Sequence, residues 1–472
     1  MDERDGWSRR DFLRGAGGAL VLGGGVGSLL EACGQSGGPA QQSSKVSVPG
    51  PKDATGTLKV WGFSGTDPLN VTAKSRYDAF RARFPNVSIE LTPGGIDRQK
   101  FLSAAAAGSP PDLLYVARPD ITSYATRGAL LDLGPYVAAA KLDTSQYRKT
   151  ALTEVTVGGK LYGVPEFTNV IVAYLNNRAL REAGLTASDV DLSDWEKMAD
   201  LNKRLTKAAG GQLQRAGYDP KLPEFTPLWA AANGGGILSA DGKRAVMDGK
   251  QTVEAVKYGV SLRQAMGGQQ AYQAFSQAWD TFGAKNQIAM DQVGVILFEQ
   301  FFMTSLGKLT PDADFTLLPF LNHRNGKQHV TFMSGNGWAI PKGAANPGVA
   351  FAMAQFLTEP DTWVLSAKAN VATFVAPKVY AGTYTGNKVA DERIFKEVYQ
   401  PSGRRSFDDG VKVVLDVQDH AVTLPPSIAG KEVTDAMTDG VNAALLGRQD
   451  ADAAMKAANQ RAQQALSPAA GG

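Results

Sequence analysis

The sequence is poor in cysteine and histidine. Cys33 is the sole cysteine among 472 residues, and the histidines are His323, His329 and His420. One cysteine cannot form an intrachain disulfide, and a zinc site built from several thiolates is excluded. His323 and His329 flank an Asn-Gly pair at 325–326, a spacing that favours a hairpin over a metal site. We therefore interpret the histidines as surface residues and predict no metal ligand.

Excess charge is also missing. The formal net charge is +3 and there is no long basic run, so nucleic acid is not expected as a partner. The chain has no G-x-S-x-G elbow, no H-E-x-x-H pair and no dinucleotide-binding glycine fingerprint after residue 33. We therefore predict no catalytic residue and no cofactor. The apolar content of 43% is ordinary for a globular protein, and the length predicts more than one domain.

Residues 1–33 have the features of an export signal. SRRDFLR at 8–14 resembles a twin-arginine signal, and the glycine-rich run that follows is too weakly apolar to span a membrane stably. LEAC at 30–33 resembles a bacterial lipobox, in which Cys33 becomes the lipidated N-terminus. The alternative is that Cys33 packs as a small apolar group. Residues 34–56, rich in Gly, Ser, Gln and Pro, are expected to form a flexible tether.

The next segment alternates strand and helix patterns. LKVWGF at 58–63, VSIEL at 87–91 and DLLYV at 112–116 are predicted strands, separated by segments with helical spacing. This alternation indicates an α/β layer with a parallel sheet, in which ligands lie beyond the carboxyl ends of the strands. Trp61, Phe63, Ser64 and Arg118 lie at those ends. Core packing for Trp61 and a solvated loop charge for Arg118 are the alternatives.

Residues 158–178, GGKLYGVPEFTNVIVAYLNNR, predict a crossing between two domains. A glycine turn and a short strand lead to Pro165, and the β-branched and aromatic run at 170–175 predicts a buried strand. The polar residues between them form an expected hinge with a binding lip. Further on, SDWE at 193–196 predicts a capping box at a helix start, and residues 431–465 are predicted to be nearly all helical.

Several motifs in order resemble one family. They are GKLYGVP at 159–165 leading into YLNN at 174–177, Trp195, NGGG at 233–236, GWAIPK at 337–342, TEP at 358–360, and LGRQ at 446–449 before a final helix. Over most of residues 57–466 the chain resembles the extracellular solute-binding proteins of family 1. These are carbohydrate-binding subunits of ABC importers related to maltodextrin-binding protein.

The resemblance implies a two-lobed α/β fold of the type II periplasmic-binding-protein kind, with a ligand cleft between the lobes. Lobe 1 is expected to hold residues 57–165 and 320–370, and lobe 2 residues 168–318 and 373–466. Hinge crossings are expected at Pro165, Glu166, Phe167 and Thr168, and again near Pro319. A third is expected near residues 368–374.

The ligand-binding candidates combine aromatic rings, which stack on sugar C–H faces, with polar groups that bind hydroxyls. They are Trp61, Phe63, Ser64, Arg118, Asn169, Trp229, Asp291, Asn336 and Trp338. Asn169 aligns with an acidic sugar-binding position of maltodextrin-binding protein. A turn residue is the alternative for Asp291, and a core residue is the alternative for Trp338.

The resemblance implies a substrate-binding lipoprotein of an ABC importer, which captures a sugar or oligosaccharide by hinge closure and is not an enzyme. Its expected partners are the carbohydrate, the permease subunits and the membrane through Cys33, and a monomer is expected. The expected location is the outer face of the cytoplasmic membrane. Other polar solutes, such as a glycerol phosphodiester or a polyamine, stay open, as does a secreted hydrolase or redox enzyme.

Overall fold

The structure is a computed structural model that describes residues 46–324, 326 and 328–467. The expected export signal and the lipidated Cys33 lie outside this range. Within it, the helices are all too short or too polar to cross a bilayer. The described end of the expected tether, residues 46–56, is part of the folded body, because Val48 packs on a core and Ala54 is fully buried.

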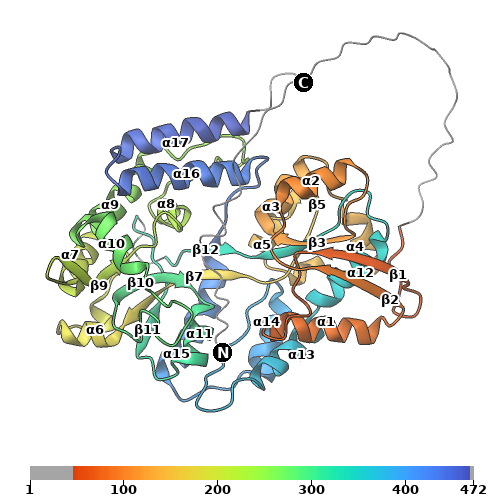
Figure 1. The fold of residues 1–472 in the computed structure, drawn as a ribbon, viewed down its shortest axis with the longest axis horizontal. Coiled ribbons are helices and arrows are strands. Elements are labelled where there is room, and N and C mark those ends of the chain that lie inside the picture. The colour runs from red at the N-terminus through yellow and green to blue at the C-terminus, as the bar shows by residue number, and fades with distance from the viewer. Residues whose placement is uncertain (1–45, 325, 327, 468–472) are drawn as a thin grey trace, which may run out of the picture. The chain divides into compact units, whose positions relative to one another are not determined.

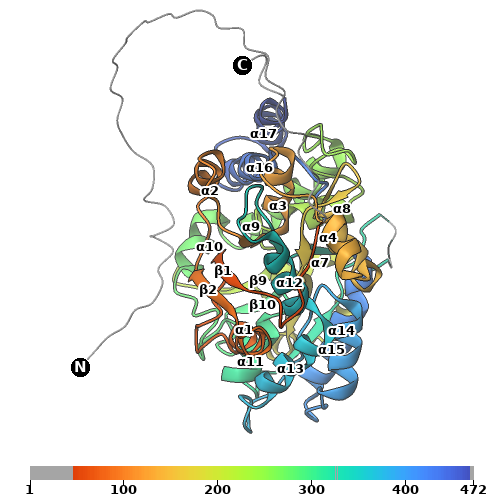
Figure 2. The same cartoon turned by 90° about the vertical axis from the view of Figure 1, so that its right-hand side faces the viewer.

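The first lobe is built on a five-stranded sheet of order β2-β1-β3-β13-β6. β1 pairs in parallel with β2 and β3, as the strand–helix alternation predicted, and β13 pairs antiparallel with β3 and β6. In Figures 1 and 2, α2 and α3 lie on one side of this sheet, and α1 and α13 on the other. Its strands are β1 (Gly56–Trp61), β2 (Val87–Thr92), β3 (Leu113–Ala117), β6 (Val164–Pro165) and β13 (Asn336–Ala339), beside the pair β4 (Thr156–Val157) and β5 (Lys160–Leu161).

Helices cover the first sheet in the segments between its strands and after the last of them. They are α1 (Val71–Arg83), α2 (Arg98–Ala106), α3 (Arg118–Thr126), α4 (Gly134–Ala140), α5 (Lys149–Thr153), α12 (Pro347–Thr358), α13 (Pro360–Val371) and α14 (Lys388–Glu397), with the short turn η2 (Thr144–Gln146). The side chain of Asn70 caps α1, and the side chain of Asp97 caps α2, by accepting a backbone N–H of the first turn.

The second lobe is built on a larger sheet of order β14-β12-β7-β10-β9-β8, with β11 also paired to β7. Its strands are β7 (Asn169–Asn176), β8 (Lys207–Ala209), β9 (Gln212–Asp219), β10 (Val293–Glu299), β11 (Phe315–Leu318), β12 (Thr331–Ser334) and β14 (Ala421–Val422). Its helices are α6 (Asn177–Glu182), α7 (Trp195–Leu205), α8 (Thr226–Ala232), α9 (Lys250–Ala265), α10 (Gly268–Ser276), α11 (Phe302–Leu309), α15 (Arg405–Val417), α16 (Gly430–Leu445) and α17 (Ala451–Leu466), with η3 (Ala187–Asp189) and η4 (Gln418–His420).

β7 is the central strand of the second lobe. Ile171, Ala173 and Leu175 face one hydrophobic core, and the alternate residues Val172 and Tyr174 face another. Because side chains alternate across a strand, burial on both faces requires an unbroken apolar run. The buried strand predicted at 170–175 is therefore confirmed, for the reason that helices cover both faces of its sheet.

The chain passes from the first sheet to the second between β6 and β7, at residues 166–168. It returns at Gly335, because β12 pairs with β7 and β13 pairs with β3. The expected crossing at Pro319 is wrong. The strands on either side of it, β11 and β12, both pair with β7, and Phe320 is buried in the same core of the second lobe as Ile171. Figure 1 shows β7 and β12 running side by side toward the first lobe.

The remaining crossings follow α13, which packs against α1. Val379 and Tyr384 belong to a core of the second lobe, whereas α14 returns to pack on α13. The chain then enters α15, which packs on β11. The expected division at 320–370 and 373–466 is therefore corrected: residues 320–334 belong to the second lobe, and α14 packs with the first.

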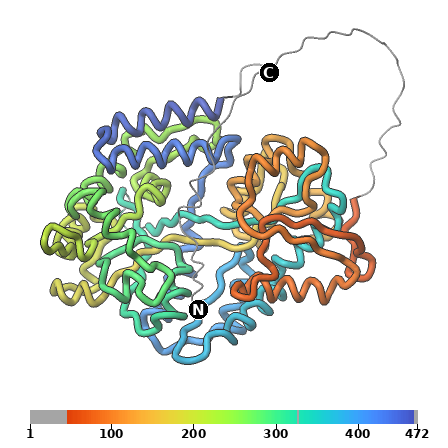
Figure 3. Tube along the Cα trace, viewed as in Figure 1, coloured from red at the N-terminus to blue at the C-terminus, as the bar shows by residue number. Residues whose placement is uncertain are grey.

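The C-terminal helices match the expectation for residues 431–465. α16 and α17 lie along one another at one end of the second lobe (Figure 3). The capping box expected at Ser193 is wrong, because α7 is capped by Asp194, whose side chain accepts the Lys197 backbone N–H. The Ser193 hydroxyl instead donates to Asp191.

Candidate ligand-binding site

A cavity of about 560 Å³ lies between the two lobes, beside the crossing at residues 166–168. The first lobe contributes residues that follow β1 and the first turns of α1, and the second lobe contributes the residues that follow β10 and the start of α11. The lining consists of Gly62, Phe63, Ser64, Asn70, Thr72, Ala73, Arg76, Tyr115, Glu166, Phe167, Asn169, Gln300, Phe301, Thr304, Trp363, Asn370, Phe374, Tyr380, Gly382, Thr383 and Tyr384.

Arg76 and Glu166 carry the formal charges of this lining, and they pair with each other. Both side chains are almost fully buried, and the Arg76 guanidinium also donates to the Thr72 and Leu357 carbonyls and lies 3.9 Å from the Trp363 ring centroid. Burial raises the pKa of Glu166, and the Arg76 charge opposes that rise. The pair therefore leaves the cavity wall without a free charge on either partner.

Asn169 and Gln300 form a neutral polar group where the crossing enters β7. Gln300 donates from Nε2 to Asn169 Oδ1 at 3.2 Å and to the Thr168 carbonyl at 2.9 Å, and its Oε1 accepts the Val170 N–H at 2.7 Å. This holds Gln300 in a fixed orientation and leaves the Asn169 amide at the cavity edge. An amide can both donate to and accept from a ligand hydroxyl.

Aromatic rings form the rest of the wall. Phe301 is 37% exposed and stacks on Phe282, with ring centroids 5.7 Å apart. On the segment between α13 and α14, Phe374 and Tyr380 meet edge to face, with ring centroids 5.4 Å apart. Phe374 and Tyr380 are partly buried, so Phe301 offers the most open ring surface of the three to a ligand.

Three of the predicted ligand residues line the cavity: Phe63, Ser64 and Asn169. Phe63 is 1% exposed and packs edge to face with Trp338, so its ring offers almost no surface to a ligand. Asn336 lies beside the lining, where its carbonyl accepts the Glu166 N–H at 3.0 Å. The expected hinge residues Glu166 and Phe167 also line the cavity.

Arg118 is a brace between the two crossings and does not line the cavity. It is fully buried, donates from Nε to Glu154 at 2.5 Å, and donates from Nη1 to the Phe167 carbonyl at 2.7 Å and the Asn336 carbonyl at 3.4 Å. The predicted ligand contact of Arg118 is therefore wrong. Side chains at the end of a strand point to either face of the sheet, and the Arg118 side chain points to the crossing segments rather than to the cavity.

The tryptophans predicted for the ligand site pack elsewhere. Trp229 is 1% exposed inside the second lobe, donates to the Pro220 carbonyl and packs on Phe320. Trp338 is fully buried between Phe63 and Tyr115. The alternative of a core residue therefore holds for Trp338, and the ligand role is corrected for both.

Trp61 and Asp291 also lie outside the lining. Trp61 packs partly buried against the cluster around Phe101, with Lys100 Nζ 5.3 Å from its ring centroid. Asp291 has a positive φ of 56° and accepts from Asn176 and from Arg215, each within 2.9 Å. Asp291 is thus a turn residue in an ion pair, which agrees with the turn alternative and not with a ligand contact.

The residues that the sequence did not single out come from the second lobe and the segment after α13. Gln300 and Phe301 directly follow the buried run of β10, which is the strand-end signal that found Phe63 and Ser64. Phe374 and Tyr380 follow no strand, and their place depends on the fold of the whole segment between α13 and α14.

Two α/β lobes joined by crossing segments, with a polar and aromatic cavity between them, define a two-lobed binding protein. The comparison with protein families agrees. A family model described as "Bacterial extracellular solute-binding protein" matches residues 75–379. The chain belongs to this family.

Curated relatives are distant in sequence. The chain is 23% identical to the maltodextrin-binding protein MdxE of Bacillus subtilis, over 60% of this chain and 66% of the relative. It is 22% identical to a maltooligosaccharide ABC transporter solute-binding lipoprotein of Streptococcus pneumoniae, over 54% of this chain and 56% of the relative. The matched region thus spans less than two thirds of each relative's length.

Solved structures match nearly the whole fold. CpMnBP1 with mannobiose bound has a TM-score of 0.71 at 21% identity, covering 86% of this chain and 99% of that one. UgpB from Mycobacterium tuberculosis in complex with glycerophosphocholine has a TM-score of 0.65 at 19% identity, covering 88% and 99%. These likenesses confirm the predicted two-lobed fold.

Proposed function

We propose that this protein is the substrate-binding lipoprotein of an ABC importer and captures a sugar or oligosaccharide between its lobes. The observation that carries the proposal is the cavity lining, in which aromatic rings stand beside neutral amides and hydroxyls. The C–H faces of a sugar stack on such rings, and its hydroxyls pair with groups such as the Asn169 amide. The relatives named for maltodextrin and maltooligosaccharide binding support the same class of ligand.

Charge separates this proposal from binding of other polar solutes. A phosphodiester needs a free cation in the wall, and a polyamine needs several free carboxylates. The charged lining residues, Arg76 and Glu166, already neutralise each other. A neutral polyhydroxylated ligand therefore fits best, although one structure with the same fold was solved with glycerophosphocholine.

Titration calorimetry against mono-, di- and oligosaccharides tests this assignment, with glycerophosphocholine and spermidine as non-sugar probes. We expect heat from at least one carbohydrate and none from the two probes. Replacing Phe301 with alanine should weaken the carbohydrate signal and leave the fold intact. Silence for every carbohydrate would defeat the sugar assignment, and a signal from glycerophosphocholine alone would replace it.

We further propose that the lobes close on the ligand by bending at Pro165, Glu166, Phe167 and Thr168 and at Gly335. Both crossings meet the same brace, Arg118, so a bend at one is transmitted to the other. Small-angle X-ray scattering should record a smaller radius of gyration when the ligand is added. No catalytic step is assigned to the cavity.

The signal-like residues 8–33 and the membership of an extracellular solute-binding family support export and membrane anchoring. We propose twin-arginine export and lipidation at Cys33, delivery of the ligand to membrane permease subunits, and a monomeric state. Replacing Arg9 and Arg10 with lysine should hold the protein inside the cell. Cys33→Ser should move the exported protein from the membrane fraction to the soluble one, whereas a protein that stays membrane-bound would refute the anchor.

A further inference from the structure

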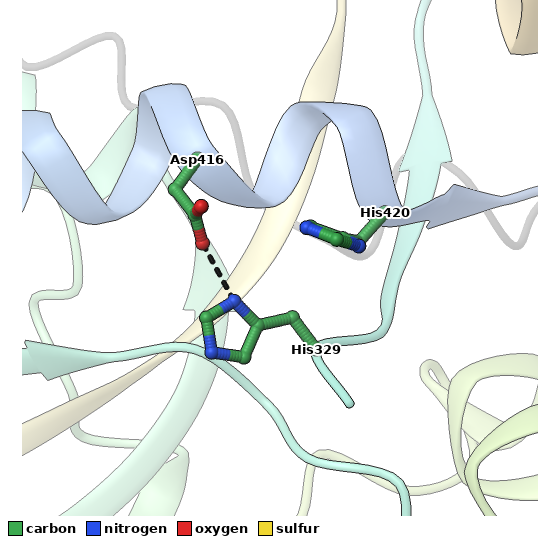
Figure 4. A group of neighbouring side chains, drawn as sticks. All are labelled: His329, Asp416 and His420. Atoms are coloured by element: carbon green, nitrogen blue, oxygen red, sulfur yellow. Dashed lines mark hydrogen bonds and ion pairs between the residues drawn. The ribbon is translucent and has the colours of Figure 1, made fainter. Parts of the chain in front are cut away.

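Two histidines and a carboxylate from separate segments of the second lobe come together on its surface. His329 precedes β12, Asp416 lies in the last turn of α15, and His420 ends η4. The potential ligand atoms of the three side chains all lie within 4.8 Å of one another. His329 Nδ1 is 2.6 Å from Asp416 Oδ2, and the two imidazole centroids are 5.4 Å apart. Figure 4 shows the three side chains turned toward a shared space.

The backbone explains why these groups converge. Asp416 and His420 are four residues apart where α15 continues into η4, a spacing that places two side chains on one helical face. His329 is held opposite them by its antiparallel bridge to Leu321 and by the pairing of β12 with β14. The cluster therefore joins a helix end to a strand start, and both are anchored in the second lobe.

The geometry is close to that of a metal site with three protein ligands. Metal–ligand distances of about 2.1 Å in a tetrahedral site place the ligand atoms about 3.4 Å apart. The side chains of His329 and Asp416 are 32% and 51% exposed, so small rotations can bring all three donors to that spacing. Exposure also leaves a fourth position open to water.

We propose that His329, Asp416 and His420 bind one divalent transition-metal ion of the zinc class. Imidazole nitrogen favours zinc, nickel or copper over magnesium and calcium, which favour oxygen ligands. The Asp416 carboxylate supplies one negative charge to the cation. None of the three residues lines the cavity between the lobes, so this site is separate from the proposed sugar site.

The site lies next to residues that reach the crossing and the first lobe. Between Asp416 and His420, Gln418 accepts a hydrogen bond from Thr168 at 3.1 Å, and Asp419 pairs with Arg148 at 3.0 Å. A metal bound by Asp416 and His420 holds both ends of that short segment. Metal occupancy therefore stabilises the part of the second lobe that contacts the hinge.

The test uses the untagged chain with Cys33→Ser, which removes its sole thiol, after dialysis against EDTA. Zinc is titrated by calorimetry, and Co²⁺ is used as a spectroscopic probe of the same site. We expect one equivalent of zinc, a higher melting temperature with zinc, and d–d absorption bands with Co²⁺. His329→Ala and His420→Gln should each weaken zinc binding by about tenfold or more.

The third histidine provides a matched control. His323 stacks on Trp195 with ring centroids 4.0 Å apart and belongs to no such cluster in the described part of the chain. His323→Gln should leave zinc affinity unchanged. Circular dichroism verifies folding for each variant, and the exposed His420 allows one substitution that leaves packing intact. No zinc binding at about 1 mM, or unchanged affinity in the folded His420→Gln variant, would overturn the proposal.

Discussion

Replacing Gly335 with alanine tests the crossing between the lobes most directly. Gly335 joins β12 to β13, and its carbonyl accepts the Arg118 backbone N–H at 3.0 Å. A Cβ built on it would lie 2.2 Å from the Phe167 carbonyl oxygen and 2.3 Å from Arg118 Nη1. Both neighbours belong to the brace between the two crossings, so neither can move without loosening the other.

The size of the effect follows from these distances. A carbon and an oxygen in contact need about 3.4 Å, so the two crossings must separate by about 1 Å. Overpacking of this kind costs about 1–3 kcal/mol, and weakening the Arg118 hydrogen bond to Phe167 adds about 1 kcal/mol. We expect a loss of about 3 kcal/mol in the free energy of unfolding, and a weaker affinity for the carbohydrate because the closed geometry is disturbed.

Urea unfolding and calorimetry of Gly335→Ala measure these two quantities. Gly94→Ala is the matched control, because Gly94 also has a positive φ, of 94°, but its added Cβ would meet nothing within 4 Å. The control carries only backbone strain, about 1–2 kcal/mol. If the two variants lose equal stability and Gly335→Ala keeps its ligand affinity, Gly335 is not a close crossing and the brace argument fails.

Three further predictions concern the cavity and one buried acid. Asn169→Ala should weaken carbohydrate binding about tenfold at an unchanged melting temperature, because Gln300 keeps its bonds to Thr168 and Val170; unchanged affinity by calorimetry would reduce Asn169 to a linker. Phe301→Ala should weaken binding by about 1–2 kcal/mol in the same assay through the lost stacking surface, and full affinity would contradict the aromatic wall. Burial raises the pKa of Asp391 from its ordinary 3.8 to about 6, so its stabilising contribution is present below pH 3.8 and is lost as pH rises through 6. Wild type should therefore lose about 2.5 kcal/mol relative to Asp391→Asn between pH 4 and 7.5 in urea unfolding; parallel pH profiles would refute this.

Strand-end reasoning located part of the cavity. Phe63 and Ser64 follow β1 and line the cavity, but Trp61, the last residue of β1, does not. Arg118 met the same criterion and is fully buried. Periodicity identifies which residues alternate, but which face of the first sheet borders the second lobe depends on how the chain crosses between them.

The hinge shows the same difference between what a local sequence pattern predicts and what strand pairing decides. The crossing between β6 and β7 follows from a turn, a proline and a buried run that are adjacent in sequence. The return crossing lies at Gly335, whereas the sequence predicted it near Pro319. The chain does not leave the second sheet at Pro319, because β11 and β12 both pair with the same edge of β7. Proline marks the end of one ladder, and only the pairing of the next strand tells whether the chain has left the sheet.

The sequence alone determined the local elements: the parallel strands of the first lobe, the two-faced burial of β7 and the helical character of residues 431–465. Each depends on the hydrophobic periodicity of residues close in the chain. Tertiary structure alone decided the pairing of Arg76 with Glu166, the brace at Arg118, and the meeting of His329 with Asp416 and His420. These contacts join residues far apart in sequence, and their partners are set by how the two sheets fold and cross, which no local pattern encodes.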